Sequence, residues 1–293
     1  MNTITQSSTG RLSLMKAAFL SVACILIFIV VAVICELLTT WISINPLKVF
    51  IREVLLRAPL TIYLLHLFAK KVVKVYNPSA IYGRLTLATI LKWTCIGLAL
   101  PLSVWGFYYC AHLIAPFKHT VPLPGSETAG IMIRWLSVSL AAGLTEQVLF
   151  RGHLFLLMKS RYSTALSVFI TSLIFGLLHI FMLSAFDVVS AIIVVAGGII
   201  AGVMFSLIYL YTRVIWLAAI VHFIWDVFFI GKVIALASSQ TDANHTIIPF
   251  KLLTNQLIFT GGNFGIESTA PSFVAYLIVI GCLYYCIGKK KLS

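Results

Sequence analysis

The chain contains the stretch Gly143-Leu144-Thr145-Glu146-Gln147-Val148-Leu149-Phe150-Arg151-Gly152-His153 inside an otherwise apolar helical segment. On insertion scales, a charged side chain at the centre of a bilayer costs roughly 2.5–3.5 kcal/mol, so Glu146 and Arg151 need partners or water. Gln147 and Arg151 are four residues apart and can form a hydrogen bond on one helix face, whereas Glu146 points about 100° away. We therefore expect Glu146 to face a partner on another helix.

Two later apolar segments offer such partners. One contains Phe175-Gly176-Leu177-Leu178-His179, and the other contains His222-Phe223-Ile224-Trp225-Asp226. His222 and Asp226 lie one helical turn apart and project to the same side. Any one of these polar residues can be explained as a contact that holds two membrane helices together. The joint pattern instead predicts one site shared by three helices.

The composition predicts an all-α polytopic membrane protein with about eight transmembrane helices. Of the 293 residues, 61% are hydrophobic and only 10% are charged, whereas soluble domains carry about 25% charged residues. The expected spans are residues 13–41, 53–69, 85–116, 128–158, 164–183, 187–211, 214–231 and 271–288, the second being the weakest. This count makes the chain an integral membrane protein, which we place in the plasma membrane.

The net charge of +13 comes from basic residues at the ends of the apolar segments, and this placement encodes orientation rather than binding to nucleic acid. With eight spans, both termini lie in the cytoplasm. The basic residues on that side are Arg11, Lys16, Lys70, Lys71, Lys74, Arg84, Lys159, Arg161, Arg213, Lys289, Lys290 and Lys291. Lys48, Arg52 and Arg57 fall on the opposite side, where residues 44–57 form either a basic interfacial helix or an ordinary helix end with snorkelling side chains.

The remaining features suggest packing and loops rather than chemistry. The Gly198-x-x-x-Gly202 spacing allows another helix to approach closely. Residues 232–270 form the longest polar segment, which we expect to be a solvated extracytoplasmic loop in preference to a substrate-selecting lid, with no role for His245. The six cysteines are interpreted as small hydrophobic residues, without the spacing of a zinc knuckle or a disulfide framework.

The three motifs, Glu-x-x-x-x-Arg-Gly, Phe-x-x-x-His and His-x-x-x-Asp, occur in this order and resemble those of the CAAX-protease and bacteriocin-processing intramembrane protease family, also called CPBP or Abi. The resemblance covers roughly Glu127 to Gly231. It implies a division into N-terminal transmembrane helices at 1–126, a protease core at 127–231, and an extracytoplasmic loop with the last transmembrane helix at 232–293.

The resemblance implies an intramembrane endopeptidase that cleaves a membrane-associated peptide or protein. It assigns the catalytic positions to Glu146, His179, His222 and Asp226, with Gln147, Arg151 and Phe175 in support. Glu146 would activate a water that His179 helps to hold. His222 would donate to the developing oxyanion, while Asp226 fixes its tautomer or closes a polar network.

One position departs from the family pattern, which usually has two adjacent glutamates where this chain has Glu146 and Gln147. If the second glutamate mainly pairs with the arginine, Gln147 still serves, and an active enzyme is favoured. If it instead helps to bind a metal or to shuttle protons, the substitution argues against activity. No cofactor is firmly predicted. Zinc, if present, would use Glu146, His179 and His222 with an open fourth position, although the His-Glu-x-x-His signature is missing.

Two other classes of function stay open. One is a non-catalytic membrane scaffold or bacteriocin self-immunity protein, of which Gln147 would be the sign. The other, less favoured, is a proton-coupled transporter in which Glu146 and the histidines relay protons. Against a transporter, the sequence shows neither an inverted repeat nor a pair of broken helices of the kind expected at a transport site.

Overall fold

The computed structural model describes residues 12–231, 233–237 and 239–292; Arg11 of the expected cytoplasmic set lies outside them. The long α-helices are α1 (Leu14–Leu38), α4 (Leu87–Cys110), α7 (Thr164–His179), α8 (Val188–Thr212), α9 (Ile215–Phe229) and α12 (Ala270–Leu292). One composite rod joins α2 (Asn45–Phe50), the π-helix η1 (Ile51–Arg57), α3 (Ala58–Phe68) and the π-helix η2 (Ala69–Val73). Another joins α5 (Gly125–Gln147), the π-helix η4 (Val148–Leu154) and α6 (Phe155–Lys159). Short helices are η3 (Pro78–Ile81), η5 (Ile180–Met182), α10 (Gln240–Asn244), α11 (Leu257–Thr260) and η6 (Ile266–Ser268).

Polar side chains fix where several of these helices begin. Ser13, Ser163 and Asp187 each accept a hydrogen bond from a backbone N–H in the first turn of the helix that follows. Thr86 and Thr89 form a reciprocal capping box at the start of α4. These caps satisfy N–H groups that have no partner inside the helix, so each apolar run starts at a defined residue.

The helical class is as expected, and the chain is an all-α polytopic membrane protein. Among the described residues, six helical stretches are long and apolar enough to cross a membrane: Leu14–Leu38, Leu87–Cys110, Gly125–Lys159, Thr164–Met182, Val188–Thr212 and Ala270–Lys289. The two other predicted spans are 214–231, which corresponds to α9 with 15 residues, and 53–69, which falls within the charged rod of residues 45–73. The count of eight therefore stays a prediction.

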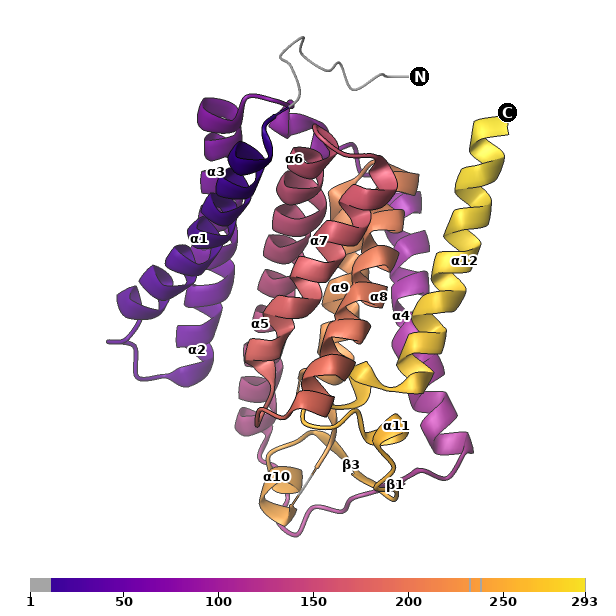
Figure 1. Cartoon of the computed structure of the whole chain (residues 1–293). Coiled ribbons are helices and arrows are strands. Elements are labelled where there is room, and N and C mark those ends of the chain that lie inside the picture. Colours follow the sequence, from indigo (N-terminus) through magenta and orange to yellow (C-terminus); the bar gives the residue numbers. More distant parts are fainter. Residues whose placement is uncertain (1–11, 232, 238, 293) are drawn as a thin grey trace.

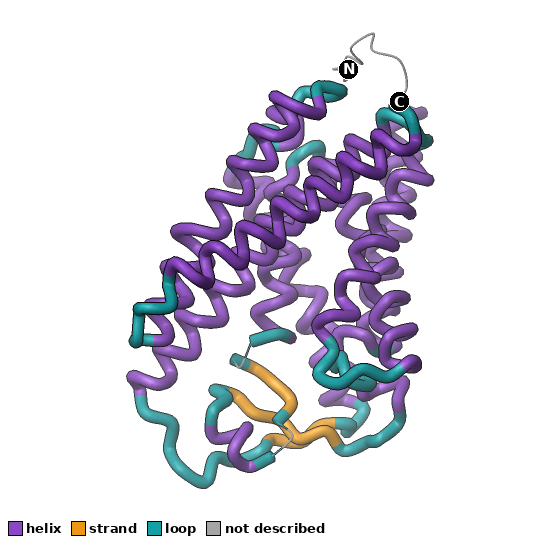
Figure 2. Tube along the Cα trace, turned by 60° about the vertical axis from the view of Figure 1, so that its left-hand side comes forward, coloured by secondary structure: helices purple, strands orange, loops and turns teal. Residues whose placement is uncertain are grey.

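The helices form one bundle, with a small β-layer at one end. The start of α1 and the end of α12 lie at the same end of the bundle (Figure 1). At the opposite end, β1 (Ile114–Pro116), β3 (Ile248–Leu252) and β2 (Ile234–Leu236) form a sheet in the order β1-β3-β2 (Figure 2). β1 pairs with β3 antiparallel, with Ile114 opposite Leu252, and β2 pairs with β3 in parallel.

This sheet corrects the prediction for residues 232–270. Their described part is not a solvated loop, because it contains two strands and three short helices and buries Ile266 and Ser268. The third strand, β1, comes from the connection between α4 and α5. A strand of three residues has too little local pattern to be found without its partner, since sheet stability comes from cross-strand pairs.

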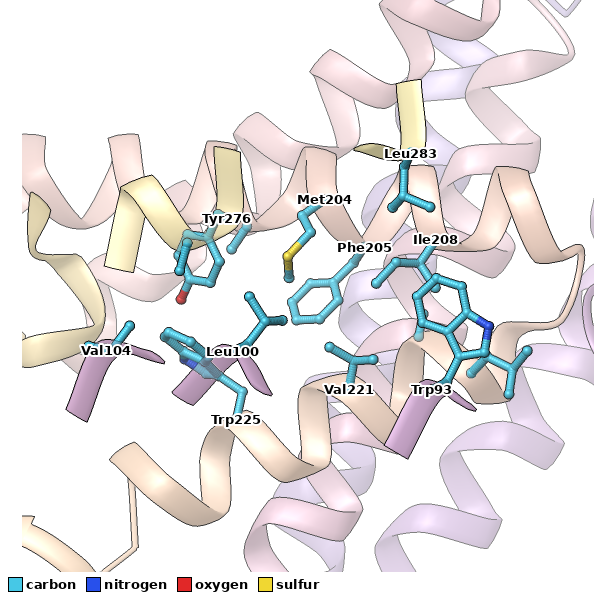
Figure 3. Packing of buried hydrophobic residues seen from close by; sticks show 14 of the residues in the cluster. Trp93, Leu100, Val104, Met204, Phe205, Ile208, Val221, Trp225, Tyr276 and Leu283 are labelled. Carbon is cyan, nitrogen blue, oxygen red and sulfur yellow. The ribbon is translucent and has the colours of Figure 1, made fainter. Parts of the chain in front are cut away.

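A large hydrophobic cluster packs α4, α8, α9 and α12 together. It includes the buried residues Trp93, Leu100, Val104, Met204, Phe205, Ile208, Val221, Trp225, Tyr276 and Leu283 (Figure 3). Such aromatic side chains bury about 150–250 Å² each. They fix α9 in place, and α9 carries two of the predicted catalytic residues.

Glycines allow the closest helix approaches, as the sequence predicts for α8. A Cβ at Gly198 would lie 2.4 Å from the Cα of Gly176 on α7, and one at Gly202 would lie 2.7 Å from the Cβ of Ser172. On α5, a Cβ at Gly143 would lie 2.9 Å from the carbonyl oxygen of Ala219 on α9. The absence of side chains at these positions lets the site-bearing helices come into backbone contact.

The basic residues of 44–57 are paired rather than free. Lys48 Nζ lies 3.0 Å from Glu36 Oε1, and Arg52 also pairs with Glu36. Glu53 forms two further ion pairs: its Oε1 lies 2.8 Å from Arg52 Nε, and its Oε2 lies 2.9 Å from Arg57 Nη1. The region is helical but belongs to the α2–η1 part of a longer rod. Ion pairs across to α1 explain why these charges occur on the side that the charge pattern disfavours.

Candidate active site

Three of the predicted catalytic side chains meet where α5 packs on α9. His222 Nε2 lies 3.9 Å from Glu146 Oε2 and 3.4 Å from Asp226 Oδ1. His222 and Asp226 are buried, and 16% of the Glu146 side chain is exposed. The contact depends on Gly143, which sits one turn before Glu146 and allows α5 to touch the backbone of α9.

Gln147 holds the other side of the His222 ring. Its Nε2 donates to His222 Nδ1 at 2.8 Å. An amide nitrogen can only donate, so Nδ1 is the acceptor and the proton of the neutral ring is on Nε2. That N–H faces Glu146 and Asp226. Gln147 is therefore a second contact, beside the predicted Asp226, that bears on the tautomer of His222.

Arg151 occupies an aromatic cage rather than pairing with Gln147, so the predicted pair is wrong. Its guanidinium carbon lies 4.2 Å from the ring centroid of Phe175, 5.3 Å from Phe205 and 5.5 Å from Phe150. Arg151 is 1% exposed. Within the described part of the chain, neither of its terminal nitrogens has a hydrogen-bond partner.

The π-helix gives the physical reason for this correction. The α-helix of α5 ends at Gln147, and η4 covers Val148–Leu154. A π-turn is wider than an α-turn, so residues four apart no longer lie directly above one another. Glu146 and Gln147 therefore both reach His222, while Arg151 turns toward Phe175. Cation–π contacts are worth about 2 kcal/mol or more when desolvated, which offsets part of the cost of burying the charge.

His179 contacts the site through the ring of Phe175. It is the last residue of α7, and its Nδ1 donates to the carbonyl oxygen of Phe175 at 2.7 Å. The neutral ring therefore has its lone pair on Nε2. Ring centroids of His179 and Phe175 are 4.3 Å apart, and those of Phe175 and His222 are 6.2 Å apart. Phe264 lies in the segment before η6, and its ring centroid is 6.1 Å from that of His179.

These side chains do not form a metal-binding set. Among the described residues, no three His, Cys, Asp or Glu side chains are grouped to hold an ion. The Nδ1 atoms of His179 and His222 are both engaged in hydrogen bonds, and the ring of Phe175 contacts both histidine rings. Among the described residues Glu146, His179 and His222 therefore form no such group, and the zinc set stays a prediction.

The candidate site lies within a segment that matches the model of a known family. Residues 128–228 match the family model for Rce1-like proteins, described as type II CAAX prenyl endopeptidase Rce1-like. We call this matched segment the Rce1-like region. The match confirms the resemblance to the CAAX-protease and bacteriocin-processing family and covers about a third of the chain. Comparisons with curated proteins and with solved structures give no significant match.

The Rce1-like region contains all of the predicted catalytic positions from Glu146 to Asp226. The family supports a protease activity of the CAAX type at the membrane. It therefore also supports a membrane-associated protein or peptide as substrate and a lipid bilayer as the environment.

Glu267 is a site neighbour that the sequence did not reveal, and it lies outside the Rce1-like region. Trp225 Nε1 donates to Glu267 Oε1 at 3.1 Å, which places the carboxylate beside the residue that precedes Asp226. Glu267 belongs to η6, in the segment expected to be a solvated loop. The signal available in the sequence was a lone acid just before an apolar run, which is too common to single out.

The acidity of Glu267 differs from that of an exposed glutamate. It lies outside the membrane-spanning helices, and burial raises its pKa from 4.5 to about 7. The hydrogen bond from Trp225 opposes this rise, and the nearby carboxylate of Glu146 adds to it. Glu267 therefore changes charge near neutral pH, next to the Rce1-like site.

We expect this pKa shift to appear in the pH dependence of stability. The stabilising contribution of protonated Glu267 is fully present below pH 4.5 and is lost as the pH rises through about 7. The total loss is at most about 3 kcal/mol, from 1.36 kcal/mol per pKa unit. Thermal unfolding in detergent at about pH 5 and pH 8 measures it. Glu267→Gln keeps an acceptor for Trp225 and should remove this decrease, whereas Glu127→Gln should not; an equal decrease in Glu267→Gln would contradict the assignment.

Proposed function

We propose that this protein is an intramembrane endopeptidase, CAAX-protease-like, that hydrolyses a peptide bond in a membrane-associated peptide or protein. The observation that carries the proposal is the placement of the Glu146 carboxylate 3.9 Å from Nε2 of His222 within the Rce1-like region. This distance is too long for a direct hydrogen bond. Both groups are thus free to bind a water and a substrate carbonyl.

In the proposed reaction Glu146 is the general base. It takes a proton from water as the water oxygen bonds to the carbonyl carbon, and the carbonyl electrons move to oxygen. Nε2–H of His222 donates to that oxyanion. When the C–N bond breaks, the leaving amine takes the proton from Glu146. His179, whose Nε2 carries a lone pair, accepts a hydrogen bond from the water and orients it.

Asp226 and Gln147 support His222 in this scheme. Asp226 Oδ1 lies 3.4 Å from His222 Nε2, which keeps the ring proton on the substrate side. Gln147 supplies a donor to Nδ1, so glutamine at this position still yields the tautomer needed for oxyanion binding. The replacement of the usual second glutamate by Gln147 is therefore compatible with activity.

The proposed organisation follows the charge pattern. Residues 127–231 form the protease core, residues 1–126 are N-terminal transmembrane helices, and residues 232–293 are an extracytoplasmic layer and the last transmembrane helix. The start of α1 and the end of α12 share one end of the bundle, and Lys16 and Lys289 lie there (Figure 1). This arrangement supports placing both termini on one side of the membrane, which the charge pattern assigns to the cytoplasm, and we place the protein in the plasma membrane.

The proposal is tested with purified protein in liposomes and a library of membrane-associated peptides. Product masses from the wild type should define one cleavage site, and cleavage should persist with a chelator. His179→Ala should lower kcat, because the water loses a hydrogen-bond partner. Gln147→Leu should lower kcat by about 10- to 100-fold with KM unchanged, since Nδ1 of His222 loses its partner.

Gln256→Leu is the matched control for Gln147→Leu, because Gln256 is exposed at the start of α11. It should cleave like the wild type. No cleavage by any folded protein, or equal cleavage by wild type and both site variants, would contradict the proposal. The first result would favour a non-catalytic scaffold or immunity protein.

A further inference from the structure

A basic groove lies between the α2–η1 stretch and α5, away from the active site. Its volume is about 320 Å³, and it is open on one side. The polar and aromatic residues that line it are Asn45, Lys48, Arg52, Arg134 and Trp135. Three of these five are cations.

The groove carries more positive charge than its carboxylates neutralise. Glu36 serves both Lys48 and Arg52. A second carboxylate, Glu53, also contacts Arg52, but Arg57 offsets its charge at 2.9 Å. The three lining cations thus share one net negative charge, which leaves an excess of two positive charges. Uncompensated charge is costly where the side chains are partly buried, as Lys48 and Arg52 are, so this excess favours an anion.

Arg134 is the cation most available to such an anion. Among the described residues no carboxylate pairs with it, and its buried Nε has no hydrogen-bond partner. Its guanidinium carbon lies 5.0 Å from the ring centroid of Trp135, which holds the group by a cation–π contact. The remaining N–H groups form a planar fork suited to a phosphate.

The surroundings of the groove point to a lipid. α2 starts at the end of α1 that is remote from the chain termini (Figure 1). The helical segments that form the groove also expose large apolar side chains: Leu47 is 44% exposed, Leu55 is 54% exposed and Ile133 is 44% exposed. Acyl chains can lie along such side chains while the headgroup occupies the basic pocket. A soluble anion would not require them.

We propose that this groove binds the phosphate headgroup of an anionic phospholipid, with Arg134 as its principal contact and Lys48 and Arg52 beside it. The bound headgroup neutralises the excess charge and links the α2–η1 stretch to α5. Since α5 also carries Glu146, the lipid holds the rod that presents the catalytic base. The binding itself does not depend on the proposed protease reaction.

The test compares binding of phosphatidylglycerol, phosphatidylcholine and inorganic phosphate to the full chain in neutral detergent, by native mass spectrometry and thermal unfolding. The wild type should retain phosphatidylglycerol selectively and unfold at a higher temperature with it. Arg134→Gln should weaken this binding about fivefold, from the roughly 1 kcal/mol that a basic residue contributes near an anionic lipid surface. Lys251→Gln, which removes an exposed cation on β3, should bind like the wild type.

Three outcomes would overturn the proposal. One is equal binding of phosphatidylglycerol and phosphatidylcholine by the wild type. Another is unchanged phosphatidylglycerol binding in Arg134→Gln. The third is an equal rise in unfolding temperature with inorganic phosphate alone, which would assign the groove to a free anion. If Arg134→Gln does not fold, Lys48→Gln takes its place with the same expected direction.

Discussion

Replacing Glu146 with glutamine is expected to lower kcat for peptide hydrolysis by about 10³-fold, in the middle of the range for loss of a general base. The substitution keeps the size and polarity of the side chain but removes its ability to take a proton from water. Glu146 Oε2 has no hydrogen-bond partner within the described residues. The variant should therefore fold and unfold like the wild type.

The measurement is single-turnover cleavage in liposomes at several pH values. Glu127→Gln is the matched control, because Glu127 lies on the same helix but contacts exposed His245 at the far end. The control should keep wild-type kcat. Full activity of Glu146→Gln would exclude Glu146 as the base, while equal loss in both variants would indicate a structural effect of altering α5.

Replacing Gly198 with leucine is expected to prevent normal folding. The first side-chain carbon alone would lie 2.4 Å from the Cα of Gly176, and backbone cannot rotate away as a side chain can. Overpacking in a core typically costs 1–3 kcal/mol, and we expect about 3 kcal/mol or more here. Because α7 carries Phe175 and His179, separation of α7 from α8 should also lower cleavage.

Thermal unfolding of purified protein in detergent measures this effect. Gly281→Leu is the control, because a Cβ at Gly281 on α12 meets nothing within 4 Å. Both substitutions gain helix propensity, about 1 kcal/mol at most, so their difference reports the helix contact. Equal unfolding temperatures for the two variants would show that α7 and α8 do not pack as closely as described.

Much of the architecture could be predicted from local patterns. Long apolar runs with few charges fix the helical membrane class, since the backbone in a bilayer must satisfy its own hydrogen bonds. The Gly198 and Gly202 spacing indicates a close helix contact without naming its partner. The three polar motifs indicate where chemistry lies, because a buried Glu, His or Asp must face something polar.

The sequence by itself thus determined the helical membrane class, the resemblance of one segment to CAAX proteases and the polar residues that need partners. Tertiary structure alone decided which partners they have. Because of the π-helix after Gln147, the Arg151 side chain lies in an aromatic cage, and Gln147 bonds to His222 instead. Pairing of β1 with β3 gave part of a polar segment regular structure, and η6 in the same segment places Glu267 against Trp225. The physical reason is that residue type and spacing specify the need for a contact, whereas helix register and pairing across distant segments specify its geometry.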